Sequence, residues 1–199
     1  GTGARVQKEL PDCTVLDGCI YVSASLEHPG VLVQHGPILR VVFGPRDPSY
    51  ISPILSAIQS DLCESGIDGV LSTHIQRDAL EKFSYVSPIG AAGVYLHAVA
   101  GDFQKEGAAR ELFKSMIREI STLAAAMGYP FEKDYVKINL EILSNLSADA
   151  TTSMQRDIME GKPSELGGLV MEPLRLAKKY SVSMPCYEEV AKVLCPLEF

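Results

Sequence analysis

The sequence has 199 residues and a mass of 21.6 kDa, which predicts one large domain or two small ones. With 46% hydrophobic and 22% charged residues, it has the composition of a globular protein rather than a disordered one. The formal net charge is −7 and no basic run occurs, so nucleic-acid binding is not expected. The longest uncharged stretch, residues 83–101, contains Pro88 and several polar residues, and predicts a buried helix rather than a membrane span.

Short β-rich runs dominate the first third of the sequence. They cover residues 14–16, 19–24, 30–34 and 39–43 and are separated by turn residues. A helix is predicted over residues 52–65 and a last strand over 69–72. Because residues 1–50 leave no room for a crossover helix, these strands are expected to be the tail of a larger sheet or a small antiparallel layer.

The rest of the sequence has a helical pattern. Helices are predicted over residues 74–93, 107–127, 132–143, 151–160, 163–180 and 185–194. In the second of these, apolar residues recur on one face from Leu112 to Leu123. In the fifth, Pro163 is expected near the first turn and Ser164 at the N-cap. The predicted fold class is therefore α+β, with a β-rich part followed by an all-α part.

The five cysteines, Cys13, Cys19, Cys63, Cys186 and Cys195, are an odd number and form no C-x-x-C pair. Neither a disulfide framework nor a zinc site is expected, and the four histidines show no metal-binding spacing. We therefore predict reduced, mostly buried thiols, no metal site and a cytoplasmic protein.

Three separated segments carry the most specific pattern. Ser153-Met154 is followed by Asp157, a glycine turn, Ser164-Glu165, an apolar helix with glycines and a late proline. Residues 79–83 read Ala-Leu-Glu-Lys-Phe, and residues 16–24 precede a Pro-Gly-Val and a His-Gly pair. In this order, and over nearly the whole chain, the segments resemble the ketopantoate reductase (2-dehydropantoate 2-reductase) family.

The resemblance implies a division into two domains. Residues 1–70 would end a Rossmann nucleotide-binding domain, and residues 71–199 would form a helical substrate-binding and dimerisation domain of the 6-phosphogluconate dehydrogenase C-terminal type. The glycines of Gly1-Thr2-Gly3-Ala4 have no preceding strand and lack the third glycine of a dinucleotide-binding turn. Most of the NADP site, and a substrate-binding asparagine, are therefore expected upstream of Gly1, in a longer protein.

The resemblance also implies the chemistry. Reduction of a 2-keto acid develops negative charge on the carbonyl oxygen, and a lysine can stabilise that charge and donate the proton. Lys82 would be this general acid, while Ser153 and Glu165 would contact the substrate. From the residues alone, each has a structural alternative: a solvent-facing helix lysine, an N-cap serine and a first-turn capping glutamate.

Three positions depart from the family pattern. Asparagines are expected four and eight residues after the lysine and three before the serine, where this sequence has Val86, Gly90 and Ala150. The exact 2-keto acid is therefore left open. The expected function is that of an NADP-dependent oxidoreductase of the type found in pantothenate biosynthesis, acting as a homodimer on a small 2-keto acid. The alternative is a catalytically inactive helical dimerisation domain of a reductase-like paralogue.

Overall fold

The computed structural model describes residues 2–195, which form two compact units that divide between Ala79 and Leu80. The first unit holds a three-stranded sheet and the second is helical, which confirms the predicted α+β class. The predicted domain boundary lay earlier, between residues 70 and 71, and the roles assigned to the two parts stay predictions. Among the described residues, none of the helices combines the length and hydropathy that a bilayer span requires.

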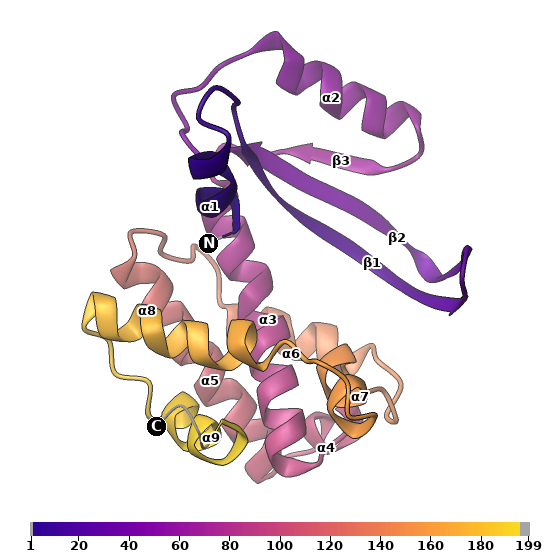
Figure 1. The fold of residues 1–199 in the computed structure, drawn as a ribbon. Coiled ribbons are helices and arrows are strands. Elements are labelled where there is room, and N and C mark those ends of the chain that lie inside the picture. The colour runs from indigo at the N-terminus through magenta and orange to yellow at the C-terminus, as the bar shows by residue number, and fades with distance from the viewer. Residues whose placement is uncertain (1, 196–199) are drawn as a thin grey trace. The chain divides into compact units, whose positions relative to one another are not determined.

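A long antiparallel hairpin forms most of the sheet (Figure 1). Strand β1 (Leu16–His28) pairs with β2 (Val31–Pro45), and the connecting turn contains Gly30 with φ of 86°, a left-handed conformation that favours glycine. The four predicted short runs are therefore two long strands. Gly18 and Gly44, which were predicted to lie in turns, lie inside β1 and β2. The pairing of these strands is irregular between Val22 and Ala24 and between Leu26 and His28.

A helical crossover connects the hairpin to the third strand. Helix α2 (Pro53–Glu64) begins after Ser52, whose side chain accepts a hydrogen bond from a backbone N–H of the first turn. It leads to β3 (Asp68–Leu71), which runs parallel to β2 in the order β1-β2-β3. Arg40 and Asp68 form an ion pair between these parallel strands. The helix and strand predicted here are both confirmed.

The C-terminal unit packs its helices around one apolar core (Figure 1). After the boundary helix α3 (Ile75–Leu96), the elements are α4 (Ala100–Gln104), α5 (Ala108–Ala126), α6 (Tyr135–Ser144), α7 (Ser153–Met159), η1 (Gly167–Met171), α8 (Glu172–Tyr180) and α9 (Pro185–Leu194). Helix α5 buries Phe113, Met116, Ile117 and Ile120 completely, which confirms the predicted amphipathic helix.

Two helices were not predicted from the sequence. Helix α1 (Thr2–Glu9) buries none of its residues, and α4 is only 5 residues long. Neither offers an apolar stripe that repeats over several turns, which is the signal that identified the longer helices.

Two other expectations were wrong. The helix predicted to start at Pro163 begins at Gly167, with a π-helical turn before α8, so Pro163 and Ser164 precede it and Ser164 is not its cap. Adjacent glycines, Gly167 and Gly168, open this helix and weaken its regular start. The thiols form no disulfide among the described residues, but only Cys19 is buried; Cys13 and Cys63 are exposed, and Cys186 and Cys195 are half-buried.

Candidate functional site

Lys82 lies in the second turn of α3, in the C-terminal unit, and is half-buried. The same turn is anchored by Ser84, which is completely buried. Its hydroxyl donates to the Glu81 carbonyl at 2.7 Å and accepts from the Asn139 side chain at 3.0 Å. The backbone that carries Lys82 is therefore held by a buried hydrogen-bond network rather than by surface contacts alone.

Ser87, one turn further along α3, joins this helix to η1 and α9. Its hydroxyl donates to the Leu169 carbonyl at 2.6 Å, so the hydrogen bond with the Tyr187 hydroxyl must be donated by the tyrosine. Tyr187 is completely buried, and burial raises its pKa above the ordinary value, which keeps it a protonated donor. The hydrogen bond from Ser87 to Leu169 therefore fixes the π-helical turn η1 against α3.

Helix α7 packs on the side of α3 that η1 contacts, and two glycines of α3 lie at this contact. A Cβ atom on Gly93 would lie 2.8 Å from the Gln155 carboxamide carbon and oxygen, and a Cβ on Gly90 would lie 3.1 Å from Met154 Cε. Gln155 in turn donates to the Ala98 carbonyl at 2.8 Å. Small residues on α3 therefore let the first turn of α7 approach closely and hold it in place.

Ser153 is the first residue of α7 and is exposed. The N-cap is Thr152, whose hydroxyl accepts from the Gln155 N–H, while the Gln155 side chain accepts from the Thr152 N–H. The alternative reading of Ser153 as the cap is therefore wrong by one residue, and this reciprocal capping box leaves the serine hydroxyl outside it.

Glu165 is also exposed and lies two residues before the first residue of η1. Its carbonyl oxygen accepts from the Leu169 N–H at 2.8 Å, so its backbone closes the first turn of the helix. Leu169 Cδ1 and Thr152 Oγ1 would lie 3.8 and 3.9 Å from a Cβ on Gly90. The segments that carry Ser153 and Glu165 therefore reach the same turn of α3, about 12 Å along the helix axis from Lys82 at 1.5 Å per residue.

The three departures from the expected asparagines have distinct surroundings. Gly90 is buried beneath Met154, and Ala150 packs against the apolar core. Val86 is half-buried, one turn after Lys82 on α3. None of these three residues offers the hydrogen-bonding groups of a carboxamide.

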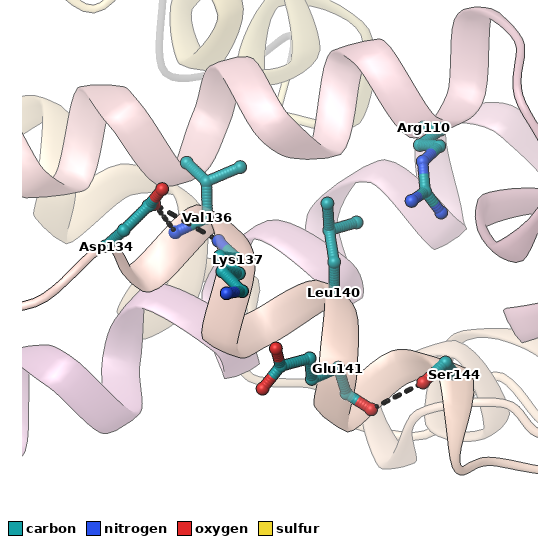
Figure 2. A pocket seen from close by; sticks show the side chains of 7 residues that line it. All are labelled: Arg110, Asp134, Val136, Lys137, Leu140, Glu141 and Ser144. Carbon is teal, nitrogen blue, oxygen red and sulfur yellow. Dashed lines mark hydrogen bonds between the residues drawn. The ribbon is translucent and has the colours of Figure 1, made fainter.

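Two hollows occur elsewhere in the C-terminal unit. One, of about 470 Å³, lies at α5 and α6 and is lined by Arg110, Asp134, Val136, Lys137, Leu140, Glu141 and Ser144 (Figure 2). Its polar groups serve the fold, because Asp134 caps α6 and Ser144 donates to the Glu141 carbonyl. The other, of about 780 Å³, is lined by η1, α8 and α9. Neither is lined by the three predicted site residues.

Ser87, Tyr187 and Gln155 were missed by sequence reasoning. Their partners lie 82, 100 and 57 residues away in the chain, so no local spacing could have identified them. Within the part of the chain that the structure describes, no group of three or more histidine, cysteine or acidic residues is arranged to hold a metal ion.

Comparison with known proteins identifies relatives of both units. Residues 74–198 match the family model described as "Ketopantoate reductase PanE/ApbA C terminal". An uncharacterised oxidoreductase of Bacillus subtilis (strain 168), YkpB, is 23% identical over 179 residues, which are 88% of this chain and 58% of the relative. The chain thus spans less than two thirds of that relative's length.

Solved structures share the fold. The 2-dehydropantoate 2-reductase of Methylococcus capsulatus is 22% identical with a TM-score of 0.85, covering 98% of this chain and 61% of that one. A D-mandelate dehydrogenase bound to NADH and anilino(oxo)acetate is 18% identical with a TM-score of 0.83, covering 96% of this chain and 62% of that one. Structures of this fold therefore include one that holds both NADH and anilino(oxo)acetate.

Proposed function

The chain belongs to the ketopantoate reductase PanE/ApbA family, and from that membership we propose that it is part of an NADPH-dependent reductase that converts a 2-keto acid to the 2-hydroxy acid. The observation that carries the proposal is the family match over residues 74–198, which includes Lys82, Ser153 and Glu165. The meeting of α7 and η1 on α3 supports it, because it brings two of the three segments together. Since the chain spans 58% of the B. subtilis relative, the activity of the whole protein is part of the proposal.

In this reaction Lys82 is the proton donor. As the carbonyl carbon gains a hydride, the π electrons of the C=O bond move to the oxygen, and the Lys82 ammonium transfers its proton there to complete the alcohol. The hydride is the contribution of a bound nicotinamide cofactor. A glycine-rich turn between a strand and a helix, of the kind that binds a dinucleotide, does not occur among residues 2–195, so we assign cofactor contacts to none of them.

Ser153 and Glu165 hold the substrate. The exposed Ser153 hydroxyl donates to the substrate carboxylate at the first turn of α7, where backbone N–H groups also favour an anion. The exposed Glu165 carboxylate accepts from the hydroxyl group of the product or pairs with the Lys82 ammonium group.

The test replaces Lys82 in the protein encoded by the full coding sequence that contains this chain. Lys82→Ala should lower kcat by a factor of about 10²–10⁴, the usual effect of removing a positioned proton donor. Lys192→Ala, an exposed lysine on α9, is the matched control and should leave kcat unchanged. Consumption of NADPH or NADH is followed with a panel of 2-keto acids.

Two results would refute different parts of the proposal. Turnover of Lys82→Ala at the parent rate would remove the lysine from its role. Failure of the parent protein to reduce any 2-keto acid with either cofactor would refute the reductase function.

Val86, Gly90 and Ala150 favour a second candidate, a catalytically inactive helical dimerisation domain, because they replace three expected amides. That candidate predicts a dimer in light scattering without cofactor binding in calorimetry. Homodimer formation and a cytoplasmic location stay predictions under both candidates.

A further inference from the structure

The hollow formed by η1, α8 and α9 takes no part in the reaction proposed above, because none of the three proposed site residues lines it. We propose that this hollow binds a small amphipathic carboxylate, with the charged head group at Lys178 and Lys192 and the apolar part on the floor of the hollow. Such a site would exist whether or not the protein is a reductase.

Two neighbouring elements of the C-terminal unit form the walls of the hollow. Its volume of about 780 Å³ lies within the range of about 300–1,000 Å³ that is usual for small-molecule sites. One wall is a single face of η1 and α8, because Met171, Leu174 and Lys178 follow one another at three- and four-residue intervals. The other wall is α9, on which Glu188 and Lys192 lie one turn apart. A ligand can therefore contact both walls at once.

The floor of the hollow is apolar. Met171, Leu174 and Val182 are half-buried and Ala177 is buried. At one end, a Cβ on Gly167 would meet nothing within 4 Å, so the protein itself does not fill this end. The half-buried side chains still expose apolar surface to water, and a hydrocarbon group that covers them is bound favourably.

The charged residues of the hollow leave a surplus of positive charge. They are Arg175, Lys178, Lys192, Glu172 and Glu188. The Arg175 guanidinium donates to both carboxylate oxygens of Glu172, at 2.6 and 2.5 Å, so these two charges compensate each other. Within residues 2–195, neither lysine forms an ion pair or a side-chain hydrogen bond. Two ammonium groups and one carboxylate remain, and the surplus of one positive charge suits a ligand with one negative charge.

The test measures the binding of decanoate to the protein from the full coding sequence by isothermal titration calorimetry, with NADPH present. Decanoate should bind, and decyltrimethylammonium, which has the same chain and a positive head group, should bind at least about 10-fold more weakly because it meets two ammonium groups. Octanoate should bind more weakly than decanoate, by up to about 4-fold for each methylene group removed. Equal affinity for decanoate and decyltrimethylammonium, or no binding of decanoate, would overturn the inference.

Three variants locate the bound carboxylate. Lys178→Glu should weaken decanoate binding by about 3- to 10-fold, because repulsion replaces the attraction of an exposed ion pair. Lys179→Glu, which is also exposed on α8 but does not line the hollow, is the matched control and should leave the affinity unchanged. Lys82→Ala should bind decanoate as the parent does. A loss of binding in Lys82→Ala would place decanoate at the proposed reaction site and overturn the inference.

Two further results would count against the hollow. A Lys178→Glu protein that is folded by circular dichroism and binds decanoate as tightly as the parent would remove the hollow as the binding site. A change of oligomeric state in this variant, measured by light scattering, would show that a second copy of the chain covers the hollow instead. None of these measurements depends on turnover, so their failure would leave the proposed function unaffected.

Discussion

Substitution of Gly93 by alanine should destabilise the C-terminal unit, although alanine is the better helix former. The added Cβ would lie 2.8 Å from both Cδ and Oε1 of Gln155 and 2.9 Å from its Nε2. Carbon atoms do not approach this closely, so the Gln155 side chain has to leave its place. It is only 8% exposed, and it has three hydrogen bonds to lose.

The magnitude follows from these bonds. The Gln155 side chain accepts from the Thr152 N–H at 2.9 Å and from the Thr152 hydroxyl at 3.1 Å, and it donates to the Ala98 carbonyl at 2.8 Å. At about 1 kcal/mol each, their loss costs about 3 kcal/mol. The helix propensity of alanine over glycine returns about 1 kcal/mol. We expect a net loss of about 2 kcal/mol in the free energy of unfolding.

The assay is urea denaturation followed by the helical circular dichroism signal. With a slope of about 2 kcal/mol per molar urea, Gly93→Ala should lower the midpoint by about 1 M. Gly168→Ala is the control, because a Cβ there would meet nothing within 4 Å, and it should leave stability unchanged or raise it by up to about 1 kcal/mol through helix propensity.

A double-mutant cycle isolates the cause. With Gln155→Ala already present, the clash is gone, and Gly93→Ala should cost almost nothing or stabilise by its helix propensity. A Gly93→Ala protein as stable as the parent would refute the reasoning, and so would an equal cost in the presence and absence of Gln155.

The remaining predictions concern one carboxyl group and the thiols. Burial raises the pKa of Glu119, although the N–H groups of Cys186 and Tyr187 donate to its carboxylate at 2.8 and 3.1 Å. The folded chain then binds the proton more tightly than the unfolded chain, so stability falls as pH rises from the ordinary value of 4.5 through the raised pKa. Thermal unfolding at a series of pH values should show a shallower fall for Glu119→Gln, and parallel curves would contradict this. Burial and the nearby Glu119 charge raise the pKa of Cys186 to about 11, so iodoacetamide at neutral pH should modify the exposed Cys13 and Cys63 first, as measured by peptide mass spectrometry. Modification of Cys186 at the same rate would show that its thiolate is accessible.

Long amphipathic elements could be predicted from the sequence because their burial repeats with the helical period. Helix α5 has its apolar face on one side of five turns, and its ends agree with the prediction within one residue. Helix α1 buries none of its residues, so no apolar face could identify it in the sequence. The start of α8 depends on a π-turn held by a side chain on another helix, so local residues did not indicate it.

The candidate site could be predicted only as separate segments. Motif resemblance selected Lys82, Ser153 and Glu165, but spacing cannot say which helix face each occupies. The capping role went to Thr152 instead of Ser153, because threonine and serine are both good caps and only the backbone geometry distinguishes them. The contacts around Gly90 could not be predicted, because they are made by residues of α7 and η1, which are distant from α3 in the sequence.

The π-turn before α8 has a consequence for sequence change in this region. Its Glu172 N–H bonds to the Gly167 carbonyl, five residues back, so it contains one residue more than a regular helical turn would. Deleting a single residue between positions 167 and 171 would remove that extra residue, and a regular i→i−4 turn could then join the flanking segments without rotating them about the axis. A one-residue deletion should therefore be tolerated in this turn better than in the regular turns of α5 or α8, where it would rotate the helix beyond it by about 100°.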